Sequence, residues 1–441
     1  MGSGVFGVST AEGWNSITLG EVCKFTGGNG FREELQGQKD GDYPFIKVSD
    51  MELPGNKKAI VEANNWIDEK TRIKEAFKAF PELSVVFAKV GAALLLNRRR
   101  ILTRPTCIDN NMMAAVPSGI EPLFLYYVLS DIDFADFVQS GAVPSINQGQ
   151  LSSILFVLPK PNEQAKIAEI LSTVDRAIEQ TEALIAKQQR IKTGLMQDLL
   201  TRGIDEHGNL RSEKTHQFKD SPVGRIPVEW EVMKLSGATS KLVTYGIVQP
   251  GGHIPDGVPF VQTKDLAQGL LCQDMMDRTS HGIHSAYQRS TIHTGDILIG
   301  IRASVGCVAE VPKELNNTNI SRGIARLSPS SKLLGRYLFW IVQAIHIQKM
   351  IKMEIKGSTY PEITLPALRN IHISVPTQEE QYQIVQSLDS VATQIRQIEI
   401  LLTKLRSLKT ALMQDLLTGK KRVIALIVDR EPKREGIDGL I

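Results

Sequence analysis

Residues 159–203 read PKPNEQAKIAEILSTVDRAIEQTEALIAKQQRIKTGLMQDLLTRG, and residues 376–420 read PTQEEQYQIVQSLDSVATQIRQIEILLTKLRSLKTALMQDLLTGK. Both contain the heptapeptide LMQDLLT, at Leu195–Thr201 and at Leu412–Thr418. The two segments align without a gap at a constant shift of 217 residues, for example from Met196 to Met413. A gapless match of this length indicates an internal duplication, so we expect a chain built from two equivalent halves.

The duplicated segment has the spacing of a coiled-coil helix. In the second copy, apolar residues recur at alternating steps of three and four: Ile384, Leu388, Val391, Ile395, Ile398, Leu402, Leu405, Leu412 and Leu416. The first copy follows the same grid but interrupts it with Thr181, Gln188 and Lys192, and Lys409 repeats Lys192. Such a stripe needs a partner helix. We predict long helices at 159–203 and 376–420 that pair antiparallel, because the chain then returns without a long crossover.

Composition restricts the class of protein. The chain has 441 residues, of which 42% are hydrophobic and 22% charged, with a formal net charge of +3. These values are typical of a soluble protein of two or three domains. The four cysteines have no C-x-x-C spacing, which favours reduced thiols in a cytoplasmic protein. No stretch is long and apolar enough for a membrane span, so we expect no membrane association.

Two globular segments accompany the helices. We predict a tail at 1–13, a mixed α/β segment at 14–158, a linker at 204–229, a second α/β segment at 230–375 and a tail at 421–441. Trp14 and Trp230 open the two segments, and Pro44–Val48 corresponds to Pro259–Thr263. Strands are expected within 17–25, 43–51, 83–96 and 111–116, and helices at 122–140 and 333–352. Between these matched residues the two segments differ strongly in sequence. We therefore expect them to share a frame, meaning one arrangement of helices and strands, with different residues in between.

This doubled arrangement resembles the specificity subunits of type I DNA restriction–modification systems. The residues that carry the resemblance are the W-x4-L openings, PFIKVSD at Pro44–Asp50, GDILIGIRASVG at Gly295–Gly306, the Glu-Gln turns at 163–164 and 380–381, and the two LMQDLLT copies. The resemblance covers about residues 14–420. It implies an α+β fold with two pseudo-symmetric mixed α/β target-recognition domains separated by two long antiparallel coiled-coil helices.

The resemblance also implies a function. Each recognition domain would read one half of a split double-stranded DNA target, and the paired helices would dock two methyltransferase subunits, with restriction subunits joining them. The chain would be non-catalytic and carry no cofactor, with S-adenosylmethionine, ATP and magnesium on its partners. The competing interpretations are a scaffold protein with two protein-binding globules and, less favoured, a self-sufficient DNA enzyme.

The repeated heptapeptide is a candidate partner contact. Its copies would present Leu195, Met196, Gln197 and Asp198, and Leu412, Met413, Gln414 and Asp415, to two copies of one partner, since matching surfaces bind matching subunits. Packing of the helix ends would explain the repetition equally well.

Most candidate DNA contacts lie in two windows without acidic residues, between Glu82 and Asp109 and between Glu314 and Glu354, and two further candidates, Lys264 and Arg302, lie outside them. Basic windows of this kind suit phosphate contact, and Arg and Asn are the residue types that read guanine and adenine edges. In the first segment the candidates are Lys89, Asn97, Arg98, Arg99, Arg100 and Arg104. In the second they are Lys264, Arg302, Asn317, Asn319 and Arg322. The alternative is a solvated charged loop and an ordinary helix face.

Motifs for chemistry are missing. The glycines at 2–7 lack the lysine of a phosphate-binding loop, and no amino-methyltransferase motif occurs. His281, His284 and Cys272 lie near one another in sequence. The first segment has no counterpart to them, so we expect no metal site and no catalytic residue.

Overall fold

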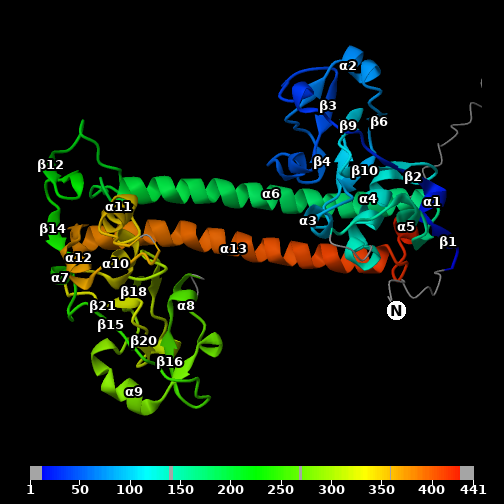
Figure 1. Cartoon of the computed structure of the whole chain (residues 1–441). Helices are drawn as coiled ribbons and strands as arrows, with labels where there is room; N and C mark the ends of the chain where they lie inside the picture. Colours follow the sequence, from blue (N-terminus) through cyan, green and yellow to red (C-terminus); the bar gives the residue numbers. More distant parts are fainter. Residues whose placement is uncertain (1–11, 139–142, 268–270, 358, 428–441) are drawn as a thin grey trace, which may run out of the picture. The chain divides into compact units, whose positions relative to one another are not determined.

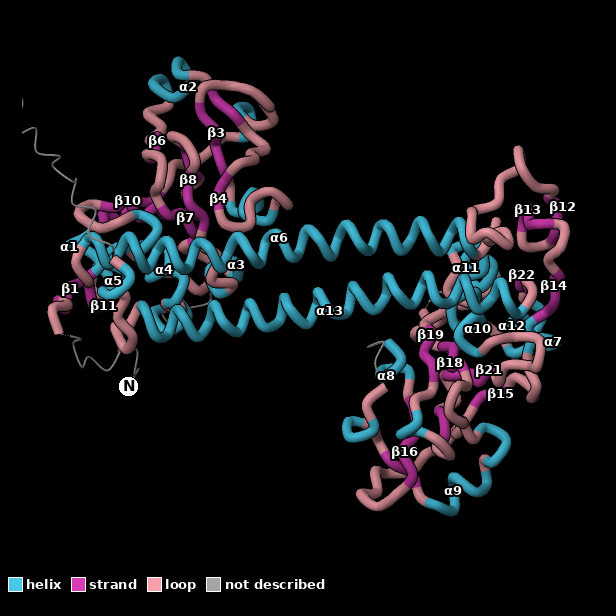
Figure 2. The backbone as a smooth tube through the Cα atoms, turned by 180° about the vertical axis from the view of Figure 1, so that it is seen from behind, coloured by secondary structure: helices cyan, strands magenta, loops and turns pink. Residues whose placement is uncertain are grey.

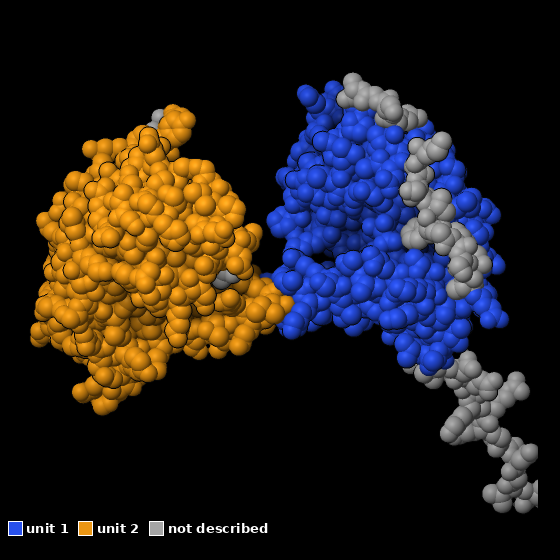
Figure 3. All heavy atoms as spheres, turned by 90° about the horizontal axis from the view of Figure 1, so that it is seen from below, with its two compact units in different colours: residues 1–182, 401–441 blue, residues 183–400 orange. Residues whose placement is uncertain are grey.

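The computed structural model describes residues 12–427 except 139–142, 268–270 and 358. It divides into two compact units, 1–182 with 401–441 and 183–400, which Figure 3 colours separately. Both long helices cross this division. Each unit therefore contains one globular segment, the start of the helix that follows it, and the end of the other long helix.

Unit 1 contains three sheets. The two-stranded sheet pairs β1 (Asn15–Thr18) with β11 (Leu155–Leu158). The five-stranded sheet has the order β2-β10-β7-β8-β4, with bounds Cys23–Gly27, Met112–Pro117, Val85–Ala88, Arg100–Leu102 and Ala59–Ile60. The four-stranded sheet has the order β5-β3-β9-β6, with bounds Trp66–Ile67, Tyr43–Ile46, Thr106–Ile108 and Ala79–Phe80. The short helices of unit 1 are α1 (Leu19–Val22), α2 (Glu69–Lys74), α3 (Ala92–Leu95), α4 (Pro122–Asp131) and α5 (Gln148–Ser152).

Unit 2 repeats this plan. It pairs β14 (Glu231–Lys234) with β22 (His372–Val375). Its four-stranded sheet β15-β21-β18-β19 comprises Thr244–Tyr245, Ile324–Leu327, Ile297–Gly300 and Val308–Glu310. Its three-stranded sheet β17-β16-β20 comprises Arg278–Thr279, Val258–Val261 and Asn319–Ile320, and the hairpin β12–β13 comprises Phe218–Ser221 and Gly224–Pro227. Its short helices are α7 (Leu235–Ala238), α8 (Thr263–Ala267), α9 (His281–Ala286), α10 (Gly335–Ile341), α11 (Ile345–Met353) and α12 (Leu365–Asn370).

The strand pairings confirm that the two globular segments share a frame. In unit 1, β3 runs parallel to β9, with Phe45 opposite Cys107. In unit 2, β16 runs parallel to β20, with Phe260 opposite Asn319. The strand orders β2-β10-β7-β8 and β15-β21-β18-β19 also correspond. The duplication predicted from the sequence patterns and the α+β fold implied by the family resemblance are both confirmed.

The two long helices are α6 (Pro161–Leu199) and α13 (Gln378–Leu416), each of 39 residues (Figures 1 and 2). In unit 1, the Lys409 ammonium lies 2.6 Å from the Asp175 carboxylate, and the Arg406 guanidinium lies 2.9 Å from that of Glu182. Ascending positions in α6 thus meet descending positions in α13, which confirms the antiparallel pairing within this unit. None of the helices in the described part of the chain has the length and apolarity of a membrane span.

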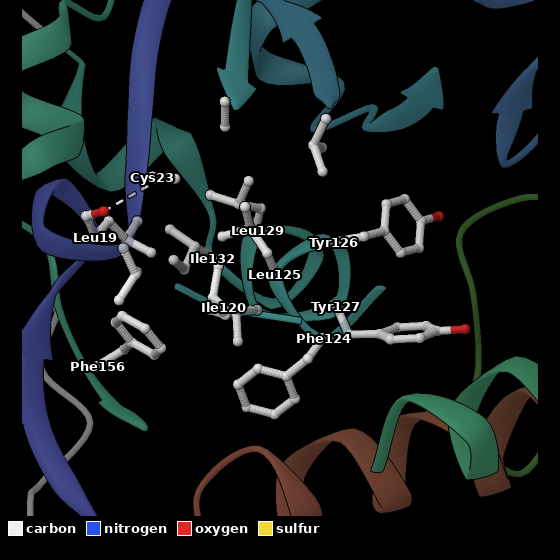
Figure 4. Close-up of a cluster of buried hydrophobic side chains, with 14 of the residues drawn as sticks. Leu19, Cys23, Ile120, Phe124, Leu125, Tyr126, Tyr127, Leu129, Ile132 and Phe156 are labelled. Atoms are coloured by element: carbon white, nitrogen blue, oxygen red, sulfur yellow. Dashed lines mark hydrogen bonds between the residues drawn. The ribbon is translucent and has the colours of Figure 1, made fainter. Parts of the chain in front are cut away.

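The core of unit 1 gathers around α4, whose residues Phe124, Leu125 and Leu129 are fully buried (Figure 4). The thiol of Cys23 donates a hydrogen bond to the carbonyl of Leu19 at 3.2 Å in this core. Burial raises the pKa of that thiol to about 12, so it is an inert packing group. All four cysteines are free.

Four local predictions are corrected. The expected strand at 17–25 is interrupted by α1, and the expected strand at 83–96 ends as α3 after Gly91, whose φ of 76° breaks the extended chain. The helix expected at 122–140 ends at Asp131, where Ile132 is extended, and its last two residues lie outside the described part. The helix expected at 333–352 is two helices, α10 and α11, separated at 342–344.

Candidate nucleic-acid interface

In each unit the parallel strand pair, β3–β9 or β16–β20, ends at one edge of the sheet. An earlier segment of the chain, which contains Asn29 in unit 1 and Ile247 in unit 2, crosses close to this edge. A Cβ atom on Gly28 would overlap the carbonyl oxygen of Asp109, and one on Gly246 would overlap that of Ile320. Only glycine permits such a close backbone approach. Ligands of open α/β sheets bind outside the carboxyl ends of parallel strands, so this edge is a candidate site in both units.

The crossing segment fixes which residues correspond at this edge. In unit 1, Asn29 of this segment forms a parallel bridge to Asp109, and in unit 2, Ile247 forms the corresponding bridge to Ser321. The following residues, Asn110 and Arg322, therefore occupy equivalent positions, and both are exposed. Asn110 and Arg322 are 322 − 110 = 212 residues apart rather than 217, because the two segments differ in length on both sides of this edge. The constant shift of the repeat therefore does not pair them.

In unit 2 the edge opens into a pocket of about 580 Å³. Five segments contribute to its wall, among them the residues that follow β16, β18 and β20. Arg302 lies in it with Nη2 2.9 Å from Oε1 of Glu362, and Arg322 and Tyr360 also line it. Tyr360 is 85% exposed, which is unusual for a large aromatic residue.

The sequence window at Asn97–Arg100 belongs mainly to the fold, which corrects part of the predicted DNA site. Arg99 is only 3% exposed and donates hydrogen bonds to the carbonyls of Leu129 and Ile132 at 3.1 and 3.0 Å, so it caps the end of α4. Burial lowers the pKa of its guanidinium to about 9. Arg100 donates to the carbonyls of Met51, Asn56 and Arg99.

Asn97 is likewise held by the fold. It has a φ of 50°, its amide donates to Asp133, and its side-chain oxygen accepts from the backbone of Phe134 at 3.0 Å. Because hydrogen bonds within unit 1 already engage these three side chains, we leave Asn97, Arg99 and Arg100 out of the proposed DNA contacts.

The other candidates of unit 1 remain accessible. Arg98 is partly exposed and paired with Glu52, and Arg104 is exposed with its guanidinium 5.6 Å from the centre of the Trp66 ring. Lys89 is partly exposed and directly follows β7.

Unit 2 requires one correction. Asn319 is fully buried: its oxygen accepts from the Ser290 hydroxyl at 2.7 Å, and its amide donates to the carbonyl of Tyr287 at 3.2 Å. It therefore holds α9 against the sheet and cannot reach DNA. Asn317 is exposed with a φ of 61°, and the ammonium of Lys264 pairs with Asp277 at 2.8 Å. In the described residues, no group of three or more metal-ligating side chains is placed to hold an ion.

The repeated heptapeptide packs at the helix ends. Leu195 and Met196 are partly buried against the core of unit 2, and Leu412 and Met413 against the core of unit 1. Gln197 and Gln414 are exposed, and Asp198 and Asp415 are half-buried. Asp198 lies 3.6 Å from Arg202, and Asp415 lies 3.0 Å from Lys421. Packing therefore accounts for the apolar positions of the repeat, and only the two glutamines face outward fully.

The Glu-Gln turns also repeat a buried cluster. In unit 1 the carboxylate of Glu163 accepts hydrogen bonds from the Trp14 indole at 3.0 Å and from Arg422 at 2.8 and 2.9 Å. In unit 2, Glu380 accepts from the Trp230 indole at 3.0 Å and from Arg211. In both units the arginine follows the end of the other long helix, so this cluster joins three chain segments in one place.

The lysines that interrupt the coiled-coil seam contact the recognition segments. Lys409 pairs with Asp175, which also accepts from the Tyr127 hydroxyl at 2.6 Å. Lys192 lies 5.1 Å from the centre of the Trp340 ring, and burial lowers the pKa of its ammonium. At each break an aromatic ring of a globular segment lies beside the seam, since the Lys409 ammonium is also 5.9 Å from the centre of the Tyr127 ring, while Lys409 still pairs with the partner helix α6 through Asp175.

Comparison with known proteins decides the family. A family model described as the type I restriction modification DNA specificity domain matches this chain twice, over residues 11–188 and 227–406. The chain belongs to the family of type I restriction–modification specificity subunits. It is a specificity subunit with two target-recognition domains, and members of this family are non-catalytic, because the catalytic activities reside on other subunits.

Relatives and solved structures agree with this assignment. The chain is 25% identical over 406 residues to the Escherichia coli EcoBI specificity subunit, covering 89% of this chain and 82% of the relative. It is 22% identical over 433 residues to the Methanocaldococcus jannaschii MjaVIII specificity subunit, covering 95% of each. The crystal structure of the type I S subunit from M. genitalium has the same fold, with a TM-score of 0.56 at 13% identity over 94% of this chain and 98% of that one.

Proposed function

We propose that this specificity subunit reads a split double-stranded DNA target, with one half-site assigned to each recognition domain. The observation that carries the proposal is the contrast at the edge of the parallel strands. Asn110 and Arg322 occupy the same place on one shared frame but differ in the bases they can read. Two readers on a common frame with different edge residues suit a target with two unlike halves.

The accessible basic residues would hold the phosphate backbone. Lys89, Arg98 and Arg104 in the first domain, and Lys264 and Arg302 in the second, supply positive charge, and Asn317 adds an exposed amide. Arg98, Lys264 and Arg302 now pair with carboxylates at partly exposed sites. Such pairs are weak in water, so a phosphate can replace the carboxylate at little cost.

The paired helices would provide the docking surface for two methyltransferase subunits, and restriction subunits would join that assembly. Matching surfaces on a duplicated chain favour two copies of one partner. Gln197 and Gln414 are the outward members of the repeat and are therefore its best candidates for contact. S-adenosylmethionine, ATP and magnesium would all be bound by these partners.

Exchange of one recognition domain tests the two-reader model. Residues 14–158 would be replaced by the matching segment of another family member, and the complex with its methyltransferase subunits would be mapped for methylated positions. We expect one half-site to change while the other half and the spacing stay the same. A change in both halves, or a wild-type target without two separate halves, would contradict the proposal.

A further inference from the structure

We propose that the pocket of unit 2 is the guanine-reading site of the second recognition domain, with Arg322 as the residue that binds the guanine edge. This inference rests on the proposed function, which it makes specific in residue and base.

Arg322 has the availability that a base-reading residue needs. It is exposed at the carboxyl end of β20, and its backbone nitrogen donates to the carbonyl of Ile247 at 2.9 Å, which fixes its position. Among the described residues, no hydrogen bond or ion pair engages its guanidinium. A free guanidinium presents two parallel donors, and guanine presents the matching pair of acceptors, O6 and N7, in the major groove.

The neighbouring arginines are already engaged. Arg302 is bonded to Glu362 at 2.9 Å, and Arg326 is buried, with a donor 2.7 Å from the carbonyl of Thr291. Two arginines, Arg302 and Arg322, and one carboxylate, Glu362, line the pocket, so one positive charge is left over whether Arg302 pairs with Glu362 or with a phosphate. The pocket is therefore cationic and suits an electron-rich base edge.

The wall around Arg322 is closely packed and hydrogen-bonded. The backbone nitrogen of Ala303 donates to the carbonyl of Pro361 at 3.2 Å, and Ala303 has a φ of 57°, which an alanine rarely adopts. A Cβ atom on Gly323 would lie 2.5 Å from Cγ2 of Thr263, so the chain beside Arg322 is closely packed. Closely packed walls reduce the entropy lost on binding and hold the reading residue in register.

Tyr360 supplies the other surface of the pocket. It is 85% exposed at the rim, and its ring offers a flat apolar surface next to the arginine. Val143 is the corresponding residue of unit 1, since the following prolines, Pro144 and Pro361, accept from equivalent nitrogens. Unit 1 therefore has Asn110 in place of the arginine and valine in place of the aromatic ring, so we expect it to read a different base.

The experiment selects target sequences from a randomised DNA duplex with the full-length chain, as wild type and as Arg322→Gln. Wild type should prefer guanine at one position of the second half-site by about 5- to 150-fold, the range that one bidentate contact provides. In Arg322→Gln this preference should fall below about 2-fold, with the first half-site unchanged. Lys352→Gln removes an exposed charge of the same domain on α11 and should leave both halves unchanged.

A base analogue gives a second measurement that does not depend on a variant. Replacing that guanine by 7-deazaguanine removes N7, and wild-type affinity should fall about 5-fold or more while Arg322→Gln is unaffected. An unchanged motif in the variant, or wild-type binding insensitive to 7-deazaguanine throughout the second half-site, would overturn the pocket assignment. If the wild type selected no motif at all, the proposed function itself would fail instead.

Discussion

Replacing Glu163 by glutamine tests whether the buried cluster at the start of α6 holds unit 1 together. The side chain of Glu163 is 3% exposed, and its carboxylate accepts from the Trp14 indole and from two nitrogens of Arg422. Glutamine keeps the shape and one acceptor oxygen but loses the charge. Its amide group then faces the donors of Arg422.

The expected loss follows from these contacts. A hydrogen bond to a charged group contributes about 1.5–3 kcal/mol, and two of them come from Arg422. Because Arg422 is 26% exposed and water can replace part of the interaction, we expect unit 1 to lose about 2 kcal/mol of stability. Glu169→Gln is the matched control on the same helix, since Glu169 is 64% exposed and pairs only with Lys166, and it should cost less than about 0.5 kcal/mol.

The same carboxylate predicts a pH dependence. Burial alone would raise the pKa of Glu163, but the hydrogen bonds from Arg422 and Trp14 outweigh it and hold the pKa below its usual value of 4.5. A lowered pKa contributes stability above that usual value and loses it as pH falls through the folded value. The difference between wild type and Glu163→Gln should therefore be full at pH 7 and shrink below about pH 4.5.

Urea unfolding, followed by hydrogen exchange of amides in unit 1, measures both effects. A Glu163→Gln protein within about 0.5 kcal/mol of wild type at pH 7 would refute the reasoning. So would a difference between the two proteins that did not shrink in acid.

Three further predictions use other parts of the chain. Gly246→Ala places a methyl group on a backbone carbonyl and should destabilise unit 2 by more than about 2 kcal/mol, whereas Gly252→Ala, which has open space, should be near neutral in the same urea assay. Arg98→Gln with Arg104→Gln should reduce the slope of log affinity against log salt by about 2, one for each lost phosphate contact; an unchanged slope removes them from the interface. Insertion of one heptad into each long helix adds about 10 Å, so the preferred spacing between half-sites should grow by about 3 base pairs, and constant spacing in target selection would reject this role.

The parts of the fold that the sequence predicted are those with a local periodic signal. The alternation of apolar residues defined α6 and α13 within a few residues, and the shift of 217 residues aligned them. The same shift indicated that the two recognition domains share one arrangement of helices and strands. Periodicity and duplication require no knowledge of contacts between distant residues, which is why they were sufficient.

The candidate site was harder to predict because it depends on such contacts. Arg99 stands in a basic window, but its partners are carbonyls of α4 about thirty residues away, and only the folded chain shows that it points inward. Asn319 is similar, since its side chain makes hydrogen bonds with Ser290 and Tyr287, which belong to another segment of the chain. The correspondence of Asn110 with Arg322 emerged only from the bridges of the crossing segment.

The two units carry the same residues at positions that hold the fold together and different residues at the candidate site. The cluster of tryptophan, glutamate and arginine is the same in both, with Trp14 and Trp230 donating to Glu163 and Glu380 at 3.0 Å. This cluster lies where the recognition domain meets both long helices, so any change there would disturb the scaffold. The edge residues Asn110 and Arg322 lie at exposed positions just beyond the parallel strand pair, where substitution costs little stability. If each domain reads one half-site as proposed, a duplicated chain with this division could change the bases read by one half without altering the other half or the proposed partner surface.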